Sequence, residues 1–157
     1  MSHITDRRFA IPFCLLLVSA LLLSAPASAA QAADKEDEPA YKEYKGVRIG
    51  MTADEARKKL GDPTDKGDKQ DFYAVNDNET VQVYYDSDKK VFALSVLYMG
   101  AAAASAPTCK SVLGAEVEAG DDGRVHKMVQ YPKAGYWVSY SRTGGDTPIV
   151  TITMQKK

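Results

Sequence analysis

The sequence of 157 residues has no excess of basic charge. Twenty Lys and Arg residues stand against twenty-one Asp and Glu residues, which gives a formal net charge of −1. A protein that neutralises a phosphate backbone or coats an anionic membrane needs a surplus of Lys and Arg. We therefore expect no nucleic-acid partner. The content of 45% hydrophobic and 26% charged residues is typical of a globular protein and excludes a wholly disordered chain.

Histidine and cysteine are also scarce, with two of each. His126 is the only histidine beyond the first thirty residues, and no Cys or second His lies at metal-ligand spacing from it. Cys109 has no nucleophile motif around it, although its side chain and that of His126 could meet in the folded chain. The acidic turns at 76–79 and 86–88 lack the order of an EF-hand loop. The sequence thus predicts no catalytic residue, no metal site and no cofactor, and we expect a protein that is not an enzyme.

Long hydrophobic runs are missing as well. The apolar stretch of residues 13–23 is shorter than the roughly 20 residues that span a bilayer. Arg7 and Arg8 precede it, and small residues that a signal peptidase accepts follow it at 24–30. We interpret residues 1–30 as a secretory signal peptide; a membrane anchor is the competing interpretation.

Cleavage is predicted near Ala29/Ala30 or near Ala32/Ala33, where small residues fit the A-x-A pattern. The product would be periplasmic or secreted, with no stable membrane insertion after cleavage. Cleavage would remove Cys14, which does not resemble the cysteine of a lipoprotein signal, and leave Cys109 without an internal disulfide partner. Cys109 is then either a small buried side chain or the site of an intermolecular bridge.

Residues 31–45 are predicted to be a flexible polar leader. They contain the charge run 34–38 and then Pro39, with no apolar periodicity. Whether Tyr41 and Tyr44 already belong to the fold stays open at this point.

The remainder of the sequence aligns weakly with itself. Leu60-Gly61 matches Leu113-Gly114, and further on Val83-Tyr84-Tyr85 matches Val138-Ser139-Tyr140. Each match falls at the same stage of a helix, strand, strand, strand progression. We infer an internal duplication, with one unit at 46–100 and a divergent second unit at 101–157; chance similarity between short strands is the alternative.

The first unit carries the clearer helix. Thr52 and Glu55 have the spacing of a capping box, so a helix is predicted to begin at Ala53. Gly61 and Pro63 should end it. A weaker helix is expected around 107–113.

Strand-forming residues follow each helix. The first unit has them at 70–75, 80–85 and 91–99, and the second at 125–131, 136–141 and 149–154, with turn compositions between them. The predicted fold class is α+β, with two tandem units of one helix and a three-stranded antiparallel sheet, the helices packed on one sheet face.

The segment from Gly50-Met51-Thr52 through Leu60-Gly61-Asp62-Pro63 resembles the SmpA/OmlA (BamE-like) domain of outer-membrane assembly. The match continues through Phe72-Tyr73 and Val83-Tyr84-Tyr85-Asp86 and covers about residues 46–99. The tandem layout is similar to that of secreted beta-lactamase inhibitor proteins. This resemblance implies a protein that binds other proteins through a concave sheet face.

Strand alternation supplies the candidate binding residues. If Val81 and Val83 face the helices, Tyr84 stands on the opposite face, and the repeat register places Trp137 there too. Exposed aromatic residues on a rigid sheet are effective interface anchors, although Tyr is also common in strand cores. We take four residues as candidate partner-binding residues: Tyr84, Trp137, Tyr98 and Tyr73.

These observations favour a non-catalytic protein-binding module, exported to the bacterial cell envelope, that binds an envelope or secreted protein through an exposed sheet face. The alternative is a protein that binds a small ligand or an envelope polymer in the cleft between the repeats.

Overall fold

A computed structural model describes residues 38–157. The predicted signal peptide and the first part of the predicted leader, residues 31–37, lie outside the described residues. The helices are α2 (Ala53–Leu60), α3 (Gly100–Ser105) and α4 (Cys109–Leu113). The strands are β1 (Asp65–Lys66), β2 (Gln70–Asn76), β3 (Glu79–Tyr85), β4 (Val91–Tyr98), β5 (Val125–Tyr131), β6 (Tyr136–Arg142) and β7 (Val150–Lys156).

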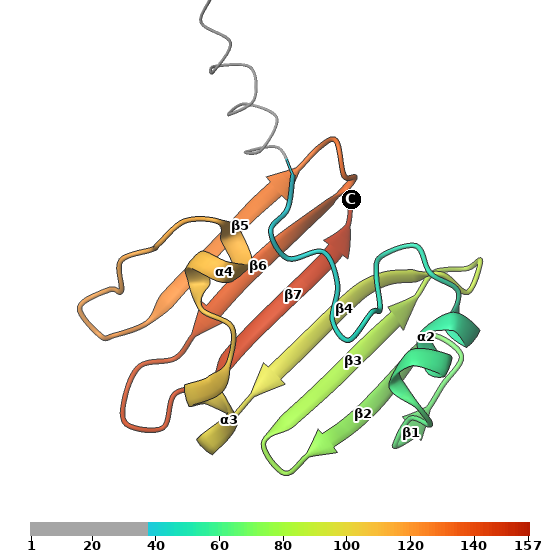
Figure 1. The fold of residues 1–157 in the computed structure, drawn as a ribbon, viewed down its shortest axis with the longest axis horizontal. Helices are drawn as coiled ribbons and strands as arrows, with labels where there is room; N and C mark the ends of the chain where they lie inside the picture. The colour runs from blue at the N-terminus through green and yellow to red at the C-terminus, as the bar shows by residue number, and fades with distance from the viewer. Residues whose placement is uncertain (1–37) are drawn as a thin grey trace, which may run out of the picture.

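The seven strands form one antiparallel sheet in the order β1-β2-β3-β4-β7-β6-β5 (Figure 1). The prediction of two tandem helix-plus-sheet units was therefore wrong. The last strand of each predicted unit, β4 or β7, pairs with the other, so that Leu94 lies opposite Met154. A unit standing alone would leave this strand as an exposed edge, and the pairing of β4 with β7 removes both edges.

The helix predicted at Ala53 is confirmed. The Thr52 hydroxyl accepts a hydrogen bond from the Glu55 amide at 3.3 Å, and the Glu55 carboxylate accepts one from the Thr52 amide at 2.9 Å. Gly61 ends the helix with a φ of 86°, a conformation that glycine adopts at little cost. The local sequence rules that place caps and stops therefore work here.

The second half has two short helices instead of one. α3 is rich in alanine, and α4 begins after Thr108, whose hydroxyl accepts a hydrogen bond from the Ser111 amide at 3.2 Å. This cap is Thr-x-x-Ser and not Thr-x-x-Glu, which is why the capping-box pattern does not find it.

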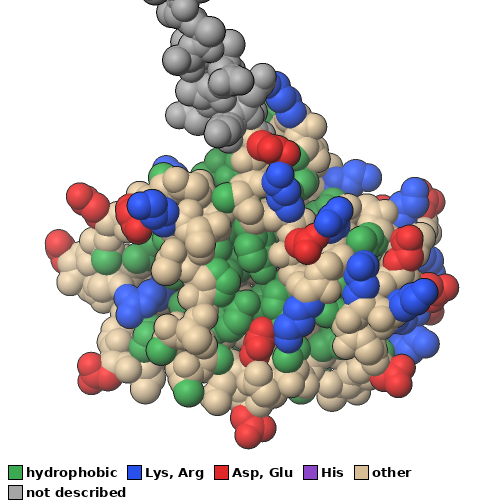
Figure 2. Space-filling model, in the orientation of Figure 1, with side chains coloured by type: hydrophobic (Ala, Val, Ile, Leu, Met, Phe, Trp, Pro, Cys, Tyr) green, Lys and Arg blue, Asp and Glu red, His purple; other side chains and the backbone are tan. Residues whose placement is uncertain are grey.

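All three helices and the segment 38–50 lie on the same face of the sheet, which we call the helix side (Figure 1). Tyr44, near the end of the predicted leader, is 6% exposed and packs into the core beside the fully buried Val47. Hydrophobic side chains gather in the middle of this face, with charged side chains around them (Figure 2). Strand residues that point to this side, such as Val83 and Val138, are fully buried.

Candidate functional site

The opposite face of the sheet, which we call the open face, is covered by no helix or loop of residues 38–157. The strand register arranges its side chains in three rows that each cross six strands, from β2 to β5. The first row is Gln70, Tyr84, Ala93, Gln155, Trp137 and Gln130. The central row is Phe72, Gln82, Ser95, Thr153, Ser139 and Met128. The third row is Ala74, Thr80, Leu97, Thr151, Ser141 and His126.

Exposure separates this face from the helix side. Of the eighteen residues, only Ala93 is buried, and the others are half-buried or exposed. Met128, an apolar residue, is 46% exposed. Because side chains alternate between the two faces of a strand, the buried neighbours of these residues form the core under the helices.

The open face has no Lys, Arg, Asp or Glu among its eighteen positions. Charged residues are 26% of the chain, so about five of eighteen positions would be charged at that average. Asp65 of the short edge strand β1, opposite Phe72, is a charged residue at the border of the face. The charged side chains of the described residues therefore lie outside the rows of the open face.

Several side chains of the open face are held by their neighbours. The Tyr84 hydroxyl donates a hydrogen bond to Gln82 at 2.7 Å, and the Tyr84 ring lies 6.2 Å from the ring of Phe92. The hydroxyls of Ser95 and Thr153 share a hydrogen bond of 3.0 Å at the β4–β7 junction. A surface that is fixed before binding loses less side-chain entropy when a partner covers it.

The structure separates the four candidate partner-binding residues into two pairs. Tyr84 and Trp137 lie half-buried on the open face, three strands apart in the first row. Tyr73 and Tyr98 point to the helix side and are 4% and 8% exposed. Only the first pair is accessible to a partner at this face.

Sequence reasoning missed most of the open face. Phe72, Phe92 and Met128 also present apolar side chains there, and none of them was predicted as a partner-binding residue. Alternation from Tyr84 and Trp137 points to the face, but the cross-strand register that groups the rows cannot be obtained without the pairing of β4 with β7.

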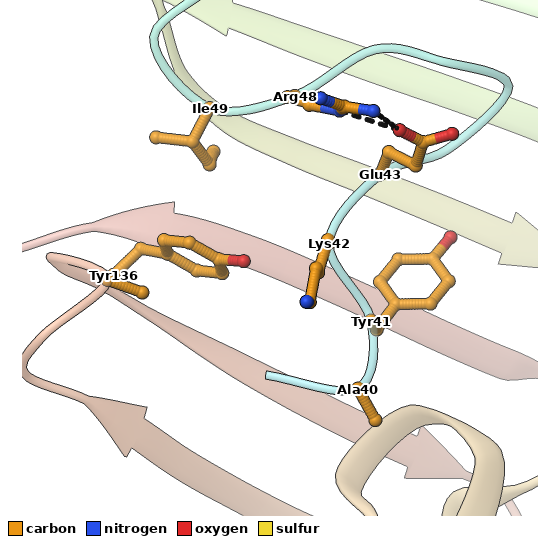
Figure 3. A pocket seen from close by; sticks show the side chains of 8 residues that line it. Ala40, Tyr41, Lys42, Glu43, Arg48, Ile49 and Tyr136 are labelled. Atoms are coloured by element: carbon orange, nitrogen blue, oxygen red, sulfur yellow. Dashed lines mark hydrogen bonds and ion pairs between the residues drawn. The ribbon is translucent and has the colours of Figure 1, made fainter. Parts of the chain in front are cut away.

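On the helix side, the chain itself fills the space between the two halves. Residues 44–47 lie there, and beside them a hollow of about 530 Å³ opens between residues 40–49 and the start of β6 (Figure 3). Arg48 and Glu43 at its rim are paired with each other at 2.6 Å, and Lys42 projects between Tyr41 and Tyr136. This hollow is the nearest counterpart of the predicted cleft.

The helix side also contains a charged pair with a buried carboxylate, Arg57 and Asp71. Asp71 is 0% exposed and accepts hydrogen bonds from Arg57 at 2.8 Å and from Tyr85 at 2.7 Å. Burial alone would raise the pKa of Asp71, but the bonds from Arg57, Tyr85 and the Gly67 amide outweigh it and hold the pKa below its ordinary value. A carboxylate whose oxygens are fully engaged in this way is suited to fixing α2 on the sheet.

Cys109 and His126 lie on opposite sides of the sheet. Cys109 packs into the helix-side core, where burial raises the pKa of its thiol, while His126 belongs to the third row of the open face. The sheet between them prevents a catalytic pair. No group of three or more His, Cys, Asp or Glu side chains within residues 38–157 is placed to hold a metal ion.

None of the helices that the structure describes is long and apolar enough to cross a membrane. Comparison of the chain with protein-family models, with curated proteins and with solved structures finds no match.

Proposed function

We propose that the chain is a non-catalytic protein-binding module of the bacterial cell envelope, exported from the cytoplasm, and that it binds through the open face. One observation carries this proposal. Seventeen of the eighteen positions of the face are exposed or half-buried, and the face contains aromatic, amide and hydroxyl side chains and no charged side chain.

This composition is that of an interface and not of an ordinary wet surface. The buried centres of protein interfaces are depleted of Lys, Glu and Asp and enriched in Tyr, Trp, Phe and Met. Tyr84 and Trp137 can bury a large area while losing little rotamer freedom. The face therefore supports a partner that covers it and excludes water.

The dimensions of the face also fit protein binding. Six strands about 4.8 Å apart and three rows about 7 Å apart cover roughly 29 by 20 Å, or about 600 Å². A standard interface buries about 800 Å² on each partner, so the rows and their borders supply most of such a contact.

Export to the envelope is supported by the sequence of residues 1–30 and by the resemblance of residues 46–99 to BamE-like domains. The alternative, a small ligand or envelope polymer between the halves, has less support. The segment 44–47 occupies that space, and the hollow that remains is rimmed by ion-paired side chains.

A photo-crosslinking residue at Thr151, in the third row, tests this function in the exporting cell. We expect crosslinks to protein, and we expect Trp137→Ala to reduce them because it removes an aromatic anchor from the same face. The matched control places the crosslinker at Lys58, an exposed residue of α2 on the helix side. The proposal fails if Thr151 gives no protein crosslink beyond the Lys58 background.

A further inference from the structure

We propose that the protein covering the open face is a second copy of this chain, paired face to face about a two-fold axis. This inference rests on the proposed function, since it names the partner of the same face. It is carried by the register of the sheet, which places large side chains where the second copy presents small ones.

The size pattern is visible within single strands. On β3, the first-row residue is Tyr84 and the third-row residue is Thr80. On β6, Trp137 in the first row stands with Ser141 in the third. Along each of these strands, a large aromatic residue and a small hydroxyl residue therefore lie on either side of the central row.

The other strands follow the same rule with one exception. β4 has Ala93 in the first row and Leu97 in the third, and β2 and β7 have a Gln in the first row and Ala or Thr in the third. On β5 the two residues, Gln130 and His126, are similar in size. Five of the six strands thus combine a larger with a smaller residue.

We place the two-fold axis perpendicular to the strands, midway between the two sheets and level with the central row. This axis sets large side chains of one copy opposite small ones of the other. It places the first row of each copy over the third row of the other. Tyr84 then faces Thr80 of the second copy, Trp137 faces Ser141 of the second copy, and Leu97 faces Ala93 of the second copy. Layers that set large against small residues interdigitate, which dense packing requires.

The other face-to-face arrangement packs less well. An axis parallel to the strands would place Tyr84 against Trp137 of the second copy, and small residues such as Ser95 against Thr153 of the second copy. Large residues would hold the sheets apart while the centre stayed unfilled, and unfilled space loses dispersion contacts. The geometry therefore selects the axis across the strands.

Charge and area are compatible with this dimer. Neither face carries a charged side chain in its rows, so two copies meet without like-charge repulsion. Two faces of about 600 Å² bury about 1,200 Å² together, which is the lower end of the range for specific, stable interfaces. The two sheets would stack about 10 Å apart with their strands within about 30° of each other.

Ser139 is suited to testing the axis because it lies in the central row and would face Ser139 of the second copy. Ser139→Lys and Ser139→Glu each place two like charges opposite one another. The dissociation constant of each variant's dimer should therefore be at least about tenfold higher than that of the parent. An equimolar mixture of the two variants should form dimers again, because Lys then faces Glu. Sedimentation velocity of the exported protein over a range of concentrations measures all three states.

Lys58→Glu on α2 is the matched control, and it should leave the self-association of the parent unchanged. Trp137 is the only tryptophan, so its emission should shift to shorter wavelength as the concentration of the parent rises. A parent that stays monomeric at several hundred micromolar overturns the inference, as does a dimer that survives both Ser139 variants or a mixture that fails to pair. A monomeric parent whose Thr151 position still crosslinks a different protein leaves the proposed function standing and overturns only the second copy.

Discussion

Val138 is fully buried on the helix side of β6, whereas Ser139, the next residue, is half-buried on the open face. The same contrast holds along β3 and β7. Yet the one buried charged residue within residues 38–157, Asp71, lies on the covered face, and the rows of the uncovered face contain no charged residue. A carboxylate is thus buried on the covered face, where burying a charge is costly, while the rows of the open face lack the charged side chains that water would solvate. This reversal supports the proposal that the open face binds a partner.

The first comparison between the faces is the loss of stability on truncating two adjacent residues of β7, one on each face. Ile152→Ala should lower the free energy of unfolding by about 2 to 5 kcal/mol, since it leaves a cavity under the helices. Thr151→Ala, on the open face, should change it by less than about 1 kcal/mol, the span of strand propensities. Urea unfolding of dilute protein measures both. Equal losses would mean that the open face is as tightly packed as the core.

The buried charged pair sharpens the comparison further. Asp71→Asn should lower the free energy of unfolding by about 3 kcal/mol, near the lower end for a broken buried pair because Arg57 keeps part of its side chain in water. Tyr85→Phe, which removes one hydrogen bond to the same carboxylate, is the milder control and should cost about 1 to 2 kcal/mol. An Asp71→Asn variant as stable as the parent would show that the pair is dispensable.

Asp71 also predicts a dependence of stability on pH. Its pKa is lower in the folded than in the unfolded chain, so its contribution is complete above the ordinary Asp pKa of about 3.9 and is lost as pH falls through the folded value. The melting temperature of the parent should therefore fall on acidification below about pH 4. The Asp71→Asn variant should show a shallower fall, and parallel curves for the two proteins would contradict the assignment.

Thr52 tests the helix side at its best-predicted point. Thr52→Ala removes the acceptor for the Glu55 amide and should cost about 1 kcal/mol. Thr108→Ala offers a comparison at α4, which lacks the reciprocal Glu bond and should lose no more than Thr52→Ala. An unchanged urea midpoint in Thr52→Ala would show that the cap does not hold α2.

These expectations also show how far the sequence alone could lead. The Thr52 cap, the Gly61 stop and the alternation of β3 depend on neighbouring residues, and each was predicted correctly. The single sheet depends on Leu94 meeting Met154, sixty positions away, and no local pattern encodes that pairing. The repeat pattern favoured two separate units because it matches strands of one half to strands of the other. It contains no information on whether β4 and β7 pair with each other.

The candidate site divided in the same way. Alternation placed Tyr84 correctly on the open face, because only its own strand was needed. The faces of Tyr73 and Tyr98 could not be predicted in this way, because they depend on which residues of β2 and β4 share a face with Tyr84. The register answers this, since Phe72 and not Tyr73 lies opposite Gln82. Aromatic content marks a strand but does not choose its face.

The smallest expected effect on stability concerns Trp137 on the open face, compared with Tyr73 on the helix side. Trp137→Ala should lower the free energy of unfolding of the monomer by only about 0.5 kcal/mol, as for a surface substitution, because the indole stands on the open face. Tyr73→Ala, on the helix side, should cost about 3 to 5 kcal/mol because it empties a core site. Thermal melts followed by circular dichroism, at concentrations low enough to exclude association, compare the two. A Trp137→Ala melt as low as that of Tyr73→Ala would place Trp137 in the core, and the binding face would then have lost its largest anchor.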